Sequence, residues 1–171
     1  LVLMAAGALV ASFSHRFDTD DVYYLANAQY VLEHPEAAMG FKLHFLAWDE
    51  PLLRSRVWST SFPFEYAQAG AAHLTGMELL TIYYLLVPPQ IGALIPLALF
   101  FLLAHFLEDA VPLLGGVLAT MLVLLVLGET HHCFGNFAFV RAFQGKVLLM
   151  AVGLPVFVAG TLWYFREPRT V

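Results

Sequence analysis

The chain has 171 residues, of which 60% are hydrophobic and 12% are charged, and its formal net charge is −5. A typical soluble domain has about 25% charged residues, so this composition excludes an ordinary water-soluble domain. Residues 12–78 carry all of the net negative charge, and this placement argues against nucleic acid as a partner.

Apolar stretches set the order of the predicted elements. Residues 1–13 are apolar but too short to cross a bilayer, so we expect them to be the end of a truncated first span. Residues 14–78 form a long polar segment, which we expect to be an external loop. Three apolar stretches follow at about 79–107, 110–128 and 147–165, and each is close to the ~20 residues that a membrane-spanning helix needs.

The remaining segments complete the predicted topology. Residues 79–165 hold spans 2–4 with a second external loop at 129–146, and 166–171 form a tail. Two spans separate the two polar loops, so both should face the same compartment, although the Lys and Arg residues do not decide which one. We predict an all-α, multi-pass transmembrane protein with about four spans, of which this chain is an N-terminal fragment.

Pro88 and Pro89 leave two interpretations of the second span open. They could kink one long helix, because neighbouring groups can satisfy the carbonyls that proline leaves free. They could also break the chain into an interfacial segment at 78–87 and a true span at 90–107.

Two amphipathic helices are predicted within the first polar loop. Residues 20–33 have apolar side chains at helical spacing, Asp18 can cap this helix, and Pro35 ends it. A second helix is predicted at 63–74, with Gly76 as its stop. Both are apolar enough to lie in the plane of the membrane interface.

Asp18, Asp20 and Asp21 crowd the start of the first of these helices. Clustered carboxylates suit Mg²⁺ or Mn²⁺, and Asp18 and Asp20 are our candidate metal ligands. Asp20 or Asp21 could also act as a general base toward an acceptor. The alternative is structural, since acids at a helix N-terminus offset the helix dipole and satisfy free N–H groups.

Arg141 and Lys146 lie among phenylalanines beside the last span. A guanidinium and an ammonium at that depth suit the phosphate or diphosphate of a lipid, so both are candidate substrate-binding residues. The alternative is that they are anchors that extend to the interface. His131, His132 and Cys133 are consecutive and cannot easily converge on one metal ion.

Two stretches carry a resemblance to a known family. The stretch "DTDDVYYLANAQYVLEH" and the later "FPFEYAQAGAAHLTGMELLTIYYLLVPPQIGALIPLALFFLLAHFL" resemble the first external loop and second span of the GT-C superfamily of membrane glycosyltransferases. The resemblance covers roughly residues 1–107. It implies that Asp20 or Asp21 is the catalytic carboxylate, which deprotonates the acceptor and helps to bind a metal. The stretch "GNFAFVRAFQGK" is also similar to loops of uncharacterised bacterial multispanning proteins.

The expected function follows from that resemblance. The chain would belong to a transferase that moves a sugar from a polyprenyl-phosphate donor to an acceptor at the outer face of a bacterial inner membrane. The alternatives are a multispanning transporter or channel subunit, with the prolines as hinges, and a membrane scaffold without chemistry. The spans hold almost no ionisable residues, which favours a site at the surface over a translocation path.

Overall fold

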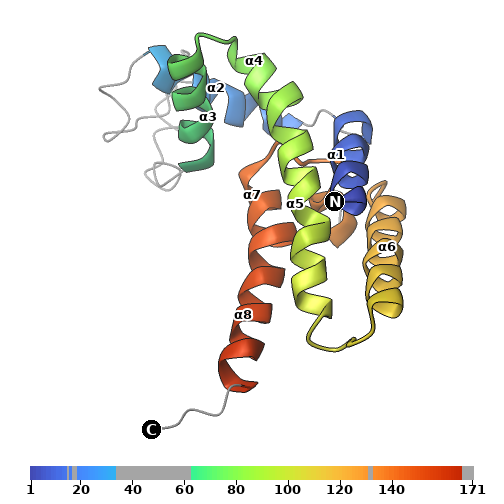
Figure 1. Cartoon of the computed structure of the whole chain (residues 1–171). Coiled ribbons are helices and arrows are strands. Elements are labelled where there is room, and N and C mark those ends of the chain that lie inside the picture. Colours follow the sequence, from blue (N-terminus) through green and yellow to red (C-terminus); the bar gives the residue numbers. More distant parts are fainter. Residues whose placement is uncertain (15, 17–18, 34–62, 131–132, 167–171) are drawn as a thin grey trace, which may run out of the picture. The chain divides into compact units, whose positions relative to one another are not determined.

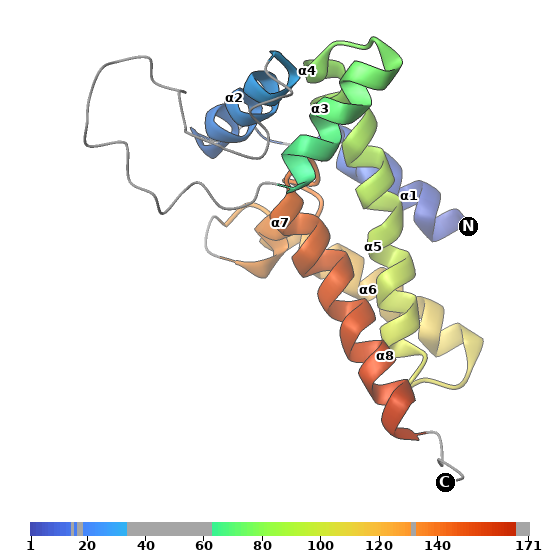
Figure 2. The same ribbon diagram turned by 90° about the vertical axis from the view of Figure 1, so that its left-hand side faces the viewer.

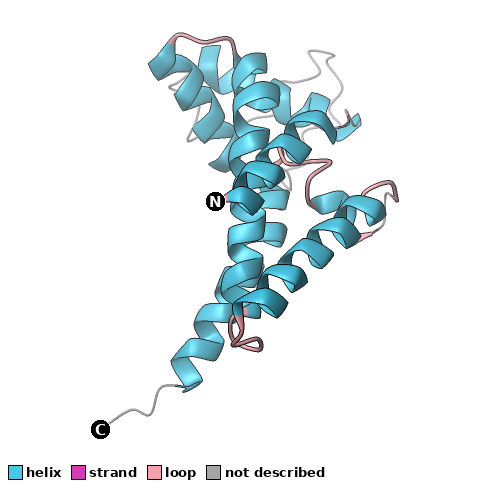
Figure 3. Cartoon of the chain, turned by 45° about the vertical axis from the view of Figure 1, so that its right-hand side comes forward, coloured by secondary structure: helices cyan, strands magenta, loops and turns pink. Residues whose placement is uncertain are grey.

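The computed structural model describes residues 1–14, 16, 19–33, 63–130 and 133–166. In these residues the regular structure is helical and includes no strand, which confirms the predicted all-α class (Figure 3). The chain divides into two compact units, which we describe separately. The bundle unit comprises residues 1–16 and 86–171, and the α2–α3 unit comprises residues 17–85.

The described elements are long α-helices together with short α, 3₁₀ and π segments. They are α1 (Val2–Ser14), α2 (Thr19–Glu33), α3 (Pro63–Thr75), α4 (Leu79–Thr81), the π-helix η4 (Ile82–Leu86), α5 (Val87–Leu103), α6 (Ala110–Leu127), the 3₁₀-helix η5 (Phe134–Phe137), α7 (Gly145–Val147), the π-helix η6 (Leu148–Gly153) and α8 (Leu154–Arg166).

Three continuous helices in the described residues are long and apolar enough to cross a membrane. They run over Leu79–Leu103, Ala110–Leu127 and Gly145–Arg166, and they correspond to the predicted spans 2, 3 and 4. The apolar helix α1 has 13 residues and is shorter than a full span. The chain therefore has the features of a membrane protein that contacts lipid.

The helix around Pro88 and Pro89 is continuous, so the predicted alternative of a break is wrong. A proline ring collides with the carbonyl four residues earlier, which belongs to Tyr84 for Pro88 and to Leu85 for Pro89. Both of these residues lie in the π-helix η4, which ends two residues before Pro88. The wider turn of a π-helix accommodates the collision, so the helix continues.

Helix α5 lies at the centre of the bundle unit, and α1, α6 and α8 each pack against it (Figure 1). The contact with α1 is the closest, because Gly7 and Gly92 face each other where the helices cross. A Cβ on either glycine would overlap the carbonyl oxygen of the other. Ala11, one turn after Gly7, is fully buried against α5.

Helix α6 buries one side and exposes the other. Its buried residues recur at helical spacing and are Leu113, Val117, Met121 and Leu124. Its exposed residues are also apolar and include Val111, Leu114, Leu118, Leu122, Val123 and Val126. An exposed apolar face on a helix of this length is suited to contact with the hydrocarbon of a bilayer.

In the α2–α3 unit, α2 packs against α3 (Figure 2). The contact uses small buried side chains, with Ala28 on α2 and Ala69 and Ala72 on α3. Gly76 follows α3 with a φ of 69°, a left-handed conformation that glycine adopts without strain. This is the helix stop that the sequence predicted.

Candidate functional site

Four polar side chains are buried in the described residues of the α2–α3 unit. Asp21 is 2% exposed, Glu65 and Gln68 are each 3% exposed, and Tyr83 is fully buried. Acidic side chains are almost never buried this completely unless they are paired or protonated. Their burial marks this unit as a candidate functional site.

Helix geometry explains how these residues reach the interior. Asp21 is in the first turn of α2, and Glu65 and Gln68 lie three residues apart on α3, so both point from the same side of that helix. Tyr83 comes from the π-helix η4. The interior of the unit is therefore polar where α2, α3 and η4 supply these side chains, and apolar at Ala69 and Ala72.

The carboxyl groups of Asp21 and Glu65 both interact electrostatically with Tyr83. Asp21 is the strongest electrostatic partner of Tyr83, and Glu65 also acts on it. Burial raises the pKa of Glu65 above its usual range, and a hydrogen bond with its own backbone opposes this in part. The pKa of Tyr66 is also raised, first by burial and then by the charge of Glu65. The described parts of this unit, 19–33 and 63–85, contain no Lys or Arg that could offset these carboxylates.

The predicted acids have different outcomes. Asp21 lies in this buried cluster. Asp20 belongs to α2, but its side chain lies outside the described residues, as does the whole of Asp18. The metal site predicted at Asp18 and Asp20 therefore stays a prediction. Among the described residues, no three His, Cys, Asp or Glu side chains are grouped so that they could hold a metal ion.

Glu65 was not predicted as a site residue. A glutamate two residues after a proline at a helix start is an ordinary first-turn acid, which usually interacts with the helix dipole in solvent. The available signal was helical periodicity within 63–74, because Gln68 and Ala72 follow Glu65 by three and seven residues and so lie on the same side of the helix.

The bundle unit contains a second polar site, in the connection between α6 and α7. Residues 138–144 have no regular helix, yet every one of them is buried. Connecting segments usually run over the surface, because their backbone groups need water. Arg141 is 6% exposed and Gln144 is fully buried. We call residues 133–147 the basic loop.

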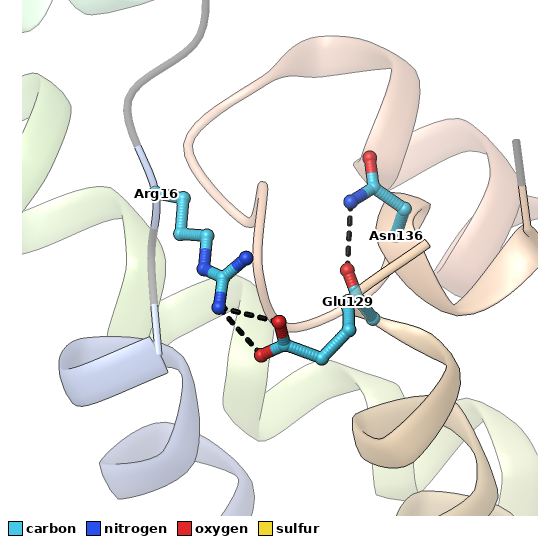
Figure 4. Close-up of polar contacts among 4 residues, drawn as sticks. Arg16, Glu129 and Asn136 are labelled. Atoms are coloured by element: carbon cyan, nitrogen blue, oxygen red, sulfur yellow. Dashed lines mark hydrogen bonds and ion pairs between the residues drawn. The ribbon is translucent and has the colours of Figure 1, made fainter. Parts of the chain in front are cut away.

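Close backbone contacts hold the basic loop against the end of α6. The Asn136 Nδ2 donates a hydrogen bond of 2.8 Å to the carbonyl oxygen of Gly128 (Figure 4). Gly135 lies so near Leu124 and Leu127 that the position has no room for a Cβ. The start of the loop is therefore fixed relative to α6.

Arg16, just after α1, holds the loop from another direction. Its backbone N–H donates to the Val140 carbonyl oxygen at 3.1 Å. Its guanidinium Nη2 contacts both carboxylate oxygens of Glu129 at 2.6 Å (Figure 4). The ion pair is exposed, so its own contribution to stability is small. The backbone bond fixes the position of Val140, the residue directly before Arg141.

Both predicted basic residues approach one aromatic ring. The Arg141 Cζ lies 5.8 Å from the centroid of Phe137, and the Lys146 Nζ lies 5.3 Å from it. An interfacial anchor would extend its charged group away from the protein, whereas Arg141 is buried within the loop. This geometry places a guanidinium and an ammonium near the same ring at the start of a candidate span.

Comparisons with known proteins identify no relative. The chain matches no protein-family model, no curated protein and no solved structure.

Proposed function

We propose that this chain is part of a membrane glycosyltransferase, which transfers a sugar from a polyprenyl-phosphate donor to an acceptor at the outer face of a bacterial inner membrane. We also propose that α1 is a fourth membrane helix and that the polar segment 14–78 faces the same compartment as the basic loop. Three long apolar helices support a multi-pass arrangement of this kind.

The burial of Asp21 carries the proposal. An aspartate that only caps a helix or offsets its dipole does so from solvent, whereas Asp21 is 2% exposed and interacts with a buried tyrosine. Buried carboxyl groups in a polar interior are typical of catalytic acids and bases. Asp21 is thus our candidate for the general base.

The proposed step is a displacement at the anomeric carbon of the sugar. A hydroxyl or amide group of the acceptor forms a bond to this carbon, and the bond from the carbon to the phosphate oxygen breaks. The electron pair of that bond leaves with the polyprenyl phosphate. The acceptor's proton passes to the carboxylate of Asp21, so the atoms and charges balance.

Arg141 and Lys146 are assigned to the leaving phosphate. Negative charge develops on that group as the bond breaks, and positioned cations stabilise it. Charge-assisted hydrogen bonds from a guanidinium and an ammonium are well suited to phosphate oxygens. A divalent ion held by Asp18 and Asp20 would supply the same stabilisation.

Substitution of Asp21 tests the catalytic role. We expect Asp21→Asn in the full-length protein to lower the rate by about 10²–10⁴-fold, because asparagine cannot accept the proton. Its thermal stability should stay near that of the wild type, since asparagine has nearly the same shape as aspartate and keeps one oxygen that accepts hydrogen bonds. The measurement is release of polyprenyl phosphate from polyprenyl-phosphate mannose and polyprenyl-phosphate glucose.

Glu33→Gln is the matched control, because Glu33 is an exposed acid on the same helix. It should retain the wild-type rate. The catalytic proposal would be contradicted by an Asp21→Asn protein that still transfers the sugar at the wild-type rate. It would equally be contradicted if the wild type released polyprenyl phosphate from neither donor.

A further inference from the structure

Phe137 is the ring that both cations of the basic loop approach. Both distances end at the centroid of its ring, so the Arg141 Cζ and the Lys146 Nζ lie no more than about 11 Å apart. Each cation is attracted to the ring, since the face of an aromatic ring carries negative potential. The two cations repel each other, and an anion that contacts both would relieve that repulsion.

The ring itself is held in place by the backbone. Phe137 is the last residue of η5, and η5 packs against α6. The Asn136 side chain bonds to Gly128, and Gly135 fits against Leu124 with no room for a side chain. A ring on such a support can orient flexible side chains before a ligand binds.

The position along the chain favours an anion carried by a lipid. Lys146 is the second residue of the candidate membrane span Gly145–Arg166, and Arg141 lies five residues earlier in the basic loop. A phosphate at the end of an apolar chain would reach cations at this depth, while its hydrocarbon stays in the bilayer.

We propose that Phe137 is the positioning residue of a lipid-phosphate site, in which its ring holds Arg141 and Lys146 ready for the phosphate of a polyprenyl phosphate. This inference rests on the proposed function, because polyprenyl phosphate is the leaving group of the proposed reaction. It adds Phe137 to the two cations and assigns to the ring the orientation of both.

Binding measurements in nanodiscs test the inference without any turnover. The full-length protein is placed in phosphatidylcholine nanodiscs, and the affinity for added polyprenyl phosphate is measured. We expect Phe137→Leu to weaken binding by about 5- to 30-fold, since two cation–π contacts are lost. Phe137→Tyr keeps an aromatic ring and should bind like the wild type.

Phe134→Leu is the matched control. Phe134 lies in the same 3₁₀-helix but is 44% exposed, and its substitution should leave the affinity unchanged. A positioning role also predicts a loss that depends on the cations. In the Arg141→Gln, Lys146→Gln background, Phe137→Leu should cause no further weakening, because the ring then has no cation to orient.

The outcomes separate the ligand sources and the two proposals. Wild-type affinity in Phe137→Leu, or an equal loss in the background without the cations, would overturn the role of the ring. Inorganic phosphate or phosphatidylglycerol that binds as tightly as polyprenyl phosphate would overturn the lipid-phosphate site. An Asp21→Asn protein that binds polyprenyl phosphate normally but still transfers sugar would overturn the proposed function and leave this inference intact.

Discussion

Glu65 is 3% exposed, and a carboxylate at such a position loses its hydration without gaining a Lys or Arg from the described part of its unit. Burial therefore favours the protonated form and raises the pKa of Glu65 above its ordinary value of 4.5. The same burial makes the group sensitive to pH. Its raised pKa links the stability of the folded α2–α3 unit to protonation.

Substitution of Glu65 should reveal this linkage. Because the pKa of Glu65 is higher in the folded state, its contribution to stability is fully present below the unfolded pKa and is lost as the pH rises through the folded pKa. We expect Glu65→Gln to be more stable than the wild type at neutral pH, with a smaller difference at acidic pH. Thermal unfolding in detergent across this pH range measures the effect.

The control for this prediction is Glu78→Gln, since Glu78 is exposed in the same unit. Its unfolding curves should follow those of the wild type at every pH. If the Glu65→Gln curves also follow them, the buried carboxyl group does not influence stability.

At the scale of the element, local signals predicted most helices, whereas close packing between helices was not visible in the sequence. The helix α2 was predicted from apolar spacing, and the end of α3 from Gly76, because these signals act within a few residues. The crossing of α1 with α5 depends on contacts between distant residues. The sequence contains no local sign that Gly7 and Gly92 meet.

The crossing of α1 and α5 gives a testable expectation. A methyl group at Gly7 or Gly92 would overlap backbone of the other helix, so Gly7→Ala and Gly92→Ala should each destabilise the bundle unit. Overpacking of this kind typically costs about 1–3 kcal/mol. The free energy of unfolding in a denaturing detergent series is the measurement.

Gly160→Ala on α8 serves as the comparison. A Cβ at Gly160 meets nothing within 4 Å, so this change should be neutral or stabilising, because alanine favours helix more than glycine. Equal stability of all three variants would show that the close crossing is absent in the membrane.

For the whole molecule, the order of the candidate spans predicts which segments share a compartment. Leu79–Leu103 and Ala110–Leu127 are separated by a short turn that contains Glu108. If both helices cross the membrane, His73 and Thr130 lie on one side and Glu108 lies on the other. This is the topology that the proposed function requires.

Cysteine labelling in intact membranes checks this topology. Cys133 is first replaced by serine, and His73→Cys, Glu108→Cys and Thr130→Cys are then made singly at these exposed positions. An impermeant maleimide should label positions 73 and 130 from the same side and position 108 from the opposite side. Labelling of position 108 from the same side as position 73 would mean that Leu79–Leu103 does not cross.

The candidate site could be predicted from the sequence only in part. Arg141 and Lys146 were identified because they lie beside an apolar span among phenylalanines, yet their shared contact with Phe137 depends on the fold of the basic loop. Asp21 was identified from the acidic run, but its burial was not. The sequence also gave no reason to separate Glu65 from other first-turn acids, since burial is set by the packing of α2 on α3.

The ion pair between Arg16 and Glu129 has a consequence for biosynthesis. The two residues are 113 positions apart in the chain. At a synthesis rate of about 5–20 residues per second, Glu129 is made about 6–23 s after Arg16. For that interval the end of α1 exists without the loop that it will hold. The basic loop can join α1 only after α5 and α6 have been made, so its assembly is a late event in the maturation of this protein.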